Sequence, residues 1–360
     1  MNKRDFILVM IKLIVGGMQF ISFKALSDTK SINLGGNVAK FSRPYFVATI
    51  LFGSVILSLI PFFYKLMRKP RTVSAPRAID LARMGVPGLS DAVAQILTQL
   101  GTIRIPVSLV MVLKGSRVVF SAILSIFMLR RKLYAYHWAS VVLCLVGLTL
   151  TSISQLINDL HGKSAIAIGI TMILAAEAFR SVRIVSEEQY IKKYKYNEFL
   201  MIGVEGVYGF VVALSALLIV NALPGSDFGS VENIDNTGHM IASSTVIIVI
   251  LALLPIWVNG MYLSGVFVTK YLSAVYNALA TVLTAVVVWL YEIIIFYSVG
   301  NGYGQPWTSS SYMQLGGFML ILISTLMYDK TLKIPALFYY PPKLEEEVKP
   351  TMAVVDDAKI

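Results

Sequence analysis

The sequence has little of what a soluble enzyme or a disulfide-bonded domain requires. Only 14% of its 360 residues are charged, and Cys144 is its one cysteine. A single cysteine cannot form a disulfide within the chain, and three scattered histidines add no metal-ligand spacing. The GxxxxGK[ST] phosphate loop, the HExxH zinc pattern and a Ser/His/Asp set are also missing. We therefore expect no enzyme activity, no metal and no cofactor.

Apolar residues are abundant instead. They make up 56% of the chain, and the mean hydropathy is +0.72. Windows of about 20 apolar residues are typical of membrane-spanning helices. They predict an all-α polytopic membrane protein with ten transmembrane helices. The predicted spans are approximately 6–26, 44–64, 79–101, 105–129, 137–156, 164–187, 198–221, 244–268, 272–297 and 311–328.

The basic residues predict the orientation of these spans. If the N-terminus is cytosolic, the cytosolic segments hold 19 Lys and Arg and the opposite side holds six. Because cytosolic loops of membrane proteins are enriched in Lys and Arg, both termini should be cytosolic. The same bias explains most of the net charge of +11. A nucleic-acid partner is therefore not expected.

Ten spans divide into two halves of five, and an odd number per half inverts the second half in the bilayer. We predict a first half over 1–156, a second half over 157–333 and a disordered cytosolic tail over 334–360. Pro87–Gly88 and Pro255 with Gly260 would then take related positions in the two halves. They predict either bends that free backbone carbonyls near a binding site or ordinary kinked helices.

The fourth and ninth spans carry polar stripes that the repeat would bring to one central cavity. Residues three or four apart lie on the same helical face. The predicted solute-binding residues are Lys114, Arg117, Ser121, Asn277, Thr281 and Thr284. Such side chains are costly toward lipid, so their face should meet protein or a wet cavity.

Other charges also lie within the predicted spans. The cations are Lys12, Arg83, Lys114, Arg117, Arg180 and Arg183, and the acids are Asp91, Glu177, Glu205 and Glu292, with Asp80 and Glu187 set aside because they end their spans. Matched depth predicts the pairs Asp91–Lys114 and Arg180–Glu205. Glu177 reaches Arg180 at i+3.

If these pairs form, Arg117 has no acidic partner. Because its guanidinium group suits a carboxylate or phosphate, this favours an anionic or zwitterionic solute. Asp91, Glu177, Arg180 and Glu205 would then serve as ion pairs or in proton coupling. The alternative is that all the charges neutralise one another and only fix helix packing. At the predicted cytosolic end of the sixth span, Glu187–Glu188 and Lys192–Lys195 predict either exposed i,i+4 pairs or a gate.

Several stretches resemble the drug/metabolite transporter superfamily, and most of all solute carrier family 35, subfamily F, with a more distant likeness to the chloroquine-resistance-transporter group. They are SLVMVLKGSRVVFSAILSIFMLRRKL, HWASVVLCLVGL, IVSEEQYIKK, GVEGVYGF and SGVFVTKYLSAVYNAL, in that order. The resemblance implies transport in an endomembrane, such as that of the lysosome, vacuole or Golgi, rather than the plasma membrane. It also implies a homodimer through the fifth and tenth spans, where Gly147 and Gly316–Gly317 permit close helix contact.

Together these features predict a secondary-active transporter that moves a small polar, anionic or zwitterionic metabolite by alternating access. Its energy would come from exchange or from a proton gradient. The alternative is a non-transporting receptor or scaffold of the same fold. In either case the partners would be the lipid bilayer and, for a transporter, a small-molecule solute.

Overall fold

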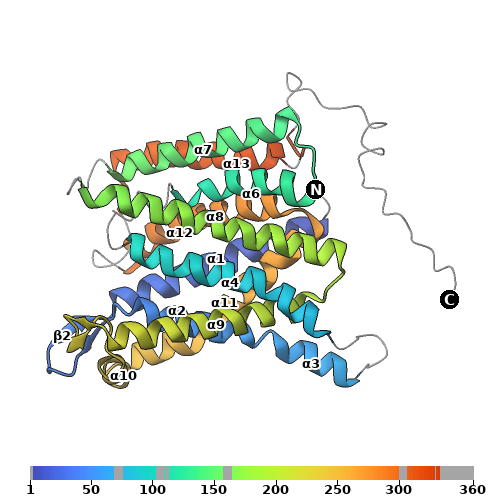
Figure 1. Ribbon diagram of the computed structural model, residues 1–360. Coiled ribbons are helices and arrows are strands. Elements are labelled where there is room, and N and C mark those ends of the chain that lie inside the picture. Colours follow the sequence, from blue (N-terminus) through green and yellow to red (C-terminus); the bar gives the residue numbers. More distant parts are fainter. Residues whose placement is uncertain are drawn as a thin grey trace.

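The computed structural model describes residues 3–68, 76–102, 110, 113–156, 164–299, 306–328 and 330–332, which are mostly helical (Figure 1). The predicted tail over 334–360 lies outside this described part. The helices are α1 (Lys3–Asp28), α2 (Pro44–Ile56), α3 (Leu59–Arg68), α4 (Ala78–Thr102), α6 (Ser116–Leu129), α7 (Ala135–Leu156), α8 (Ser164–Lys193), α9 (Glu198–Ala222), α10 (Ile234–Ala242), α11 (Thr245–Tyr271), α12 (Ala274–Val299) and α13 (Ser309–Tyr328). Two short antiparallel hairpins, β1 (Lys30–Ile32) with β2 (Val38–Lys40) and β3 (Pro224–Gly225) with β4 (Gly229–Ser230), lie in loops.

Six helical stretches are long and apolar enough to cross a membrane. They are Lys3–Asp28, Pro44–Arg68, Glu198–Ala222, Thr245–Tyr271, Ala274–Ser298 and Ser309–Tyr328. The other four predicted spans coincide with α4, α6, α7 and α8, which are shorter or carry more charge. Residues 105–109 and 111–112 of the predicted fourth span lie outside the described part. The chain is therefore an integral, multi-pass membrane protein.

Local sequence explains where several of these helices begin. Pro44 occupies the first turn of α2, where its missing N–H costs nothing. The side chains of Asn197 and Ser244 cap α9 and α11 by accepting backbone N–H groups of the first turn. Arg130 ends α6 in the left-handed conformation, with a φ of 51°. The capping residues place each apolar run at a defined start, so facing helices keep a fixed register.

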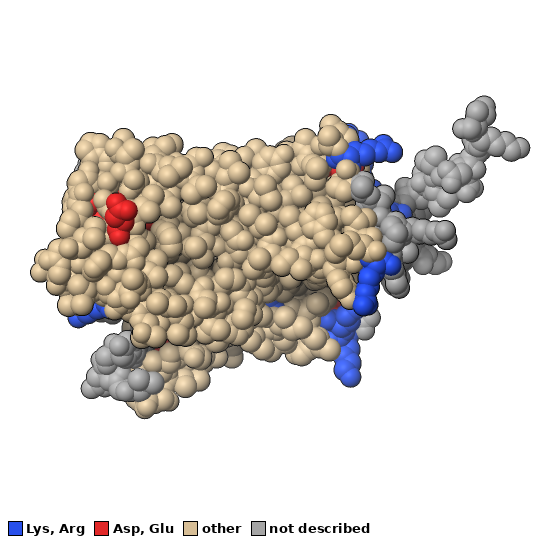
Figure 2. Space-filling view, turned by 90° about the horizontal axis from the view of Figure 1, so that it is seen from below, with Lys and Arg blue, Asp and Glu red and all other residues tan. Residues whose placement is uncertain are grey.

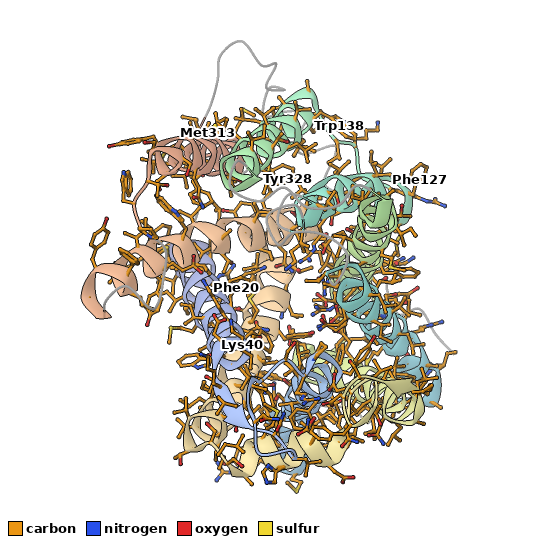
Figure 3. The ribbon with its side chains drawn as sticks, turned by 90° about the vertical axis from the view of Figure 1, so that its left-hand side faces the viewer. Phe20, Lys40, Phe127, Trp138, Met313 and Tyr328 are labelled. Atoms are coloured by element: carbon orange, nitrogen blue, oxygen red, sulfur yellow. The ribbon has the colours of Figure 1, made fainter. Side chains whose placement is uncertain are left out.

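The helices pack mainly as antiparallel neighbours from different parts of the chain. α13 packs on α7, α4 on α8, α2 on α9, and α1 on α11. Figure 3 shows α7 and α13 together at one edge of the molecule, with Trp138 and Met313 on them. At their crossing, a Cβ on Gly147 would lie 2.7 Å from the carbonyl oxygen of Gly317, and a Cβ on Gly317 would lie 2.6 Å from that of Gly147. The close contact predicted for these glycines is thus made within one chain.

In the third and eighth spans, α4 and α11 continue as helices through Pro87 and Pro255, so neither helix is interrupted at its proline. The glycines beside them serve close packing instead. A Cβ on Gly88 would lie 2.8 Å from the backbone oxygen of Glu205, and one on Gly260 would lie 2.6 Å from a methyl group of Val15. Gly88 therefore lets α4 approach α9 at the depth of Glu205.

Charge is concentrated at the two ends of the helical body. In Figure 2 most of the visible Lys and Arg side chains lie at the right-hand end, where Figure 1 places the N-terminus, and the surface between the ends carries little charge. At the opposite end, Arg43 pairs with Asp227, and Glu232 accepts the backbone N–H groups of Tyr45 (3.0 Å) and Phe46 (2.8 Å). These contacts tie the start of α2 to the loop after α9.

Candidate functional site

A chain of ion pairs crosses the interior between α4, α6, α8 and α9. Its first member is Glu177 of α8, whose side chain is fully buried. Arg117 of α6 lies 2.6 Å from Glu177 Oε2, and Arg180 lies 2.9 Å from Oε1. The predicted i,i+3 pair of Glu177 and Arg180 is confirmed. The prediction that Arg117 is left unpaired is wrong, because α6 packs on α8 at the level of Glu177.

Asp91 of α4 continues the chain of ion pairs. Arg183 Nη1 lies 3.3 Å from Asp91 Oδ2, and Arg180 Nε lies 3.7 Å from Oδ1. The hydroxyl of Tyr262 on α11 donates to Oδ2 over 2.6 Å. Among the described residues Asp91 makes no pair with Lys114, so that prediction is wrong. It assumed that α4 meets the fourth span most closely, whereas α4 packs on α8.

Arg183 joins three carboxylates. Besides Asp91, its Nε lies 2.7 Å from Glu187 Oε1 and 3.3 Å from Glu205 Oε2. The predicted pair of Arg180 with Glu205 is wrong. Arg183, about one helical turn further along α8, contacts Glu205 instead. Arg180 instead donates to the side-chain oxygen of Gln95 over 2.8 Å.

Lys12 of α1 occupies the polar stripe of α12. Its ammonium group donates to the carbonyl oxygen of Asn277 and to Thr281 Oγ1, each over 2.9 Å, and also contacts Asn277 Oδ1. The side-chain amide of Asn277 donates in turn to Thr269 over 2.8 Å. Lys12 is 1% exposed, and no carboxylate of the described residues lies within 4 Å of it. A buried ammonium held only by neutral oxygens is an unusual arrangement in a membrane interior.

The remaining predicted solute residues take different positions. Lys114 is half-buried just before α6 and forms no ion pair within the described ranges. Ser121 is fully buried, and its hydroxyl has no hydrogen-bond partner among the described residues. The hydroxyl of Thr284 donates a hydrogen bond to the carbonyl of Ala280. The Thr284 side chain also packs against Gly16 of α1, where a Cβ would lie 3.0 Å from it. The structure thus brings Asn277 and Thr281 together on Lys12, while Thr284 faces the backbone of α1.

The connected network has one more acid than base. Its members, each within 4 Å of the next, are Asp91, Glu177, Glu187, Glu205, Arg117, Arg180 and Arg183. Lys12 and Lys114 stand outside it as two further cations. The described interior therefore holds an acid-rich ion network with positive side chains beside it.

A second cluster closes the end of the molecule that holds the N-terminus. The fully buried carboxylate of Glu188 pairs with Arg131 beyond α6 and with Lys192 at 2.7 Å. It also accepts the backbone N–H of Ala274 at the start of α12 over 2.8 Å. Lys192 donates to the carbonyl of Leu272. The predicted i,i+4 pair exists, but Glu188 is buried and joins three parts of the chain rather than lying exposed.

Four residues of the interior were left out of the predicted site. Lys12 and Arg183 were recognisable as membrane-embedded cations, but no sequence spacing links Lys12 to Asn277, 265 positions away. Glu187 was set aside because the predicted span ended on it, whereas α8 runs on to Lys193. Tyr262 carries no signal in the sequence, since tyrosine is common in membrane helices.

Comparisons with known proteins agree with this architecture. The Triose-phosphate Transporter family matches residues 33–329. Solute carrier family 35 member F6 of Homo sapiens is 22% identical over 341 residues, and that of Pongo abelii is 22% identical over 343; each alignment covers 91% of this chain and 89% of the relative. A crystal structure aligns with a TM-score of 0.60 at 10% identity, covering 92% of this chain and 100% of that chain. This last likeness shows a shared fold alone.

A multi-pass membrane protein with a charged interior is the class that fold and site define. The chain belongs to the Triose-phosphate Transporter family. The resemblance to subfamily F of solute carrier family 35 is confirmed, and members of this family are transporters rather than enzymes. Family membership indicates that the chain carries a solute.

Proposed function

We propose that the protein is a secondary-active transporter of a small anionic or zwitterionic metabolite in an endomembrane, with both termini in the cytosol. Its two halves, 1–156 and 157–333, are inverted repeats that rock against each other about an interior site. Exchange or a proton gradient supplies the energy. The family and the charged interior support this proposal over a receptor or scaffold of the same fold.

The packing of the helices supports the inverted repeat. An inverted repeat makes the first span equivalent to the sixth, the second to the seventh, and so on to the fifth and tenth. When each span is replaced by its equivalent, packed helix pairs become other packed pairs. The α1–α11 pair becomes α8–α4, the α1–α12 pair becomes α8–α6, and the α4–α9 pair becomes α11–α2. The pairs α2–α9, α6–α12 and α7–α13 map onto themselves. Such a pattern is expected of two halves with the same fold.

The observation that carries the solute class is a pair of lysines that have no carboxylate within 4 Å among the described residues. Lys12 is buried on the stripe of Asn277 and Thr281, and Lys114 precedes α6, the symmetry mate of α12. Cations gathered in a low-dielectric interior are stabilised by a bound anion. A carboxylate or phosphate between α1, α6 and α12 would supply that charge.

The charged clusters at the two ends of the molecule are suited to act as gates. The Glu188 cluster joins α8 to the segment after α6 and to the start of α12. At the opposite end, Arg43 and Asp227 join the start of α2 to the loop after α9. Opening one cluster while the other stays closed would expose the interior to one side at a time. A homodimer through α7 and α13 remains a further expectation.

Counterflow in proteoliposomes tests the proposal. Purified protein is reconstituted with a panel of unlabelled anionic, zwitterionic and cationic metabolites inside, and uptake of the labelled counterpart is measured. We expect flux of an anionic or zwitterionic solute, reduced at least about tenfold by Lys114→Gln, as for one lost charge-assisted contact. The matched control is Lys132→Gln, which removes an exposed cation after α6.

Two results would separate the alternatives. If folded wild-type protein catalyses no flux with any member of the panel, the receptor or scaffold interpretation replaces the transporter. If only cationic solutes exchange, the charge argument is wrong while transport stands. Antibody access to a tagged C-terminus after selective permeabilisation tests the cytosolic termini, and co-localisation with organelle markers tests the endomembrane.

A further inference from the structure

Two buried carboxyl groups compete for one nitrogen atom of the interior network. Glu187 Oε1 lies 2.7 Å and Glu205 Oε2 lies 3.3 Å from Arg183 Nε. Arg183 Nε carries a single hydrogen, so it cannot satisfy both acids at once. Glu187 is completely buried and Glu205 is 2% exposed, so water does not screen one carboxylate from the other.

Three oxygens of this pair lack a hydrogen-bond donor. Among the described residues, no donor reaches Glu187 Oε1, Glu187 Oε2 or Glu205 Oε1 with hydrogen-bonding geometry. The Glu187 and Glu205 carboxyl groups nevertheless meet at the same atom, since both lie within 3.3 Å of Arg183 Nε. Two ionised carboxylates can only accept hydrogen bonds, whereas a protonated one can donate to its neighbour. One proton on the pair would therefore supply a donor that the two ionised carboxylates lack.

The surrounding charges also favour one bound proton. Asp91 of α4 presents a third carboxylate to Arg183, while Tyr262 of α11 donates to Asp91 and stacks on Arg183, whose Cζ lies 4.2 Å from the ring centre. Lys12 of α1 does not pair with Glu187, since no carboxylate of the described residues lies within 4 Å of its ammonium group. The connected network counts four carboxylates against three guanidinium groups, so one bound proton makes it neutral.

We propose that Glu187 and Glu205 hold one proton between their carboxyl groups, and that this proton binds together with the anionic solute. The proton comes from water on one side of the membrane and is released to water on the other side. Its charge adds to that of Lys12 and Lys114, so binding of the proton favours binding of the anion and the reverse. The inference rests on the proposed transport function and specifies its coupling as proton–anion symport.

Glu187 and Glu205 lie near the end of the molecule that holds the N-terminus, which suits release of the proton toward that side. Glu187 lies six residues before the end of α8, and Glu205 lies seven residues after the start of α9. At about 1.5 Å per residue both are roughly 10 Å from that end. Glu188 is the next residue after Glu187, and its partner Lys192 lies one residue before the end of α8, so we expect opening of the Glu188 cluster to expose the proton site.

Infrared spectroscopy tests the shared proton without transport. At neutral pH we expect the carbonyl stretching band of a protonated carboxylic acid in the wild type. Glu187→Gln and Glu205→Gln should each abolish this band, because the acid that remains can ionise beside Arg183. The control Glu198→Gln, which neutralises an acid paired with Lys270 at the start of α9, should keep it. A band that survives in both glutamine variants, or is missing from the wild type, overturns the inference.

Proteoliposomes with an imposed pH gradient test the coupling. In the wild type and Glu198→Gln, solute uptake should accelerate with the gradient and a trapped pH dye should report proton movement with the solute. Glu187→Gln and Glu205→Gln should keep solute counterflow but lose both effects, and unchanged melting temperatures verify their folding. Variants that keep the gradient effect, or a wild type driven by Na⁺ instead, overturn the proton site while leaving transport intact. Absence of all counterflow would instead contradict the proposed function, and the infrared result would then decide the proton site alone.

Discussion

Lys12 on α1 donates a hydrogen bond to Thr281 on α12 over 2.9 Å, joining residues 269 positions apart. Its other partners are the backbone and side-chain oxygens of Asn277. An ammonium buried without a nearby carboxylate adds little to stability, because its lost hydration is not recovered from an opposite charge. We attribute its presence to solute binding.

The first prediction concerns Lys12 itself. Lys12→Met should weaken uptake of the anionic solute by about tenfold to a hundredfold, the range for loss of a charge-assisted contact. The melting temperature should stay constant or rise, since methionine fills the space without a buried charge. Lys40→Met, at an exposed pair with Asp28, is the control. A large fall in melting temperature with normal uptake would assign Lys12 to structure alone.

The second prediction concerns the ion pair of Arg117 and Glu177. Arg117→Met leaves the fully buried Glu177 with Arg180 alone, and should lower the free energy of unfolding by about 3–5 kcal/mol. Adding Glu177→Gln should restore much of this loss, because no uncompensated carboxylate then remains. Unfolding in detergent for the two single variants and the double variant measures the coupling. Additive losses would show that the two groups do not interact.

The third prediction concerns the crossing of α7 and α13. Gly147→Ala places a methyl group 2.7 Å from the Gly317 carbonyl, so the two helices must separate. We expect a loss of about 1–3 kcal/mol, as for other overpacked sites. Gly316→Ala is the matched control, since its nearest neighbour, Leu150, is 3.8 Å away. Equal melting temperatures for the two variants would contradict the packing.

The fourth prediction concerns pH at the end opposite the N-terminus. Burial alone would raise the pKa of Asp227, but hydrogen bonds from Arg43, Asn233 and Asn236 outweigh it and lower the pKa. Stability from a carboxylate with a lowered pKa is present above its ordinary value, about 3.9, and is lost as pH falls through the folded value. Hydrogen exchange at the start of α2 should therefore stay slow down to about pH 4 and accelerate below it.

Asp227→Asn should remove that acid step and make exchange faster at neutral pH. Glu232 works in the opposite sense, because burial raises its pKa despite two backbone hydrogen bonds. Its protonation as pH falls favours the folded state, so Glu232→Gln should leave the acid step in place. An acid step that persists in Asp227→Asn would assign it to another group.

Much of the helical layout could be predicted from the sequence, because twenty-residue apolar windows and Lys/Arg bias follow directly from the bilayer. Helices occupy all ten predicted ranges, with the start of the fourth outside the described part. Extra elements, such as α10 and the two hairpins, escaped prediction because short loop structure depends on tertiary contacts like that of Glu232 with the start of α2.

The interior pairs could be predicted less well. Depth comparison placed Arg180 opposite Glu205, but the contact is made by Arg183, one turn away. Depth says nothing about which helices are neighbours or which face each side chain takes. Local pairs such as Glu177 with Arg180 and Glu188 with Lys192 could be read from spacing, whereas Lys12 with Asn277 required the packing of α1 on α12.

Alternating access to Thr281 is the most direct test of the account. Cys144 is the single cysteine, so Cys144→Ala with Thr281→Cys gives one reporter thiol beside Lys12. Transport predicts that membrane-impermeant thiol reagents reach this thiol from either side in separate experiments, and that the anionic solute slows labelling. Labelling from one side only, unchanged by any transported or bound solute, would contradict alternating access and favour a receptor or scaffold.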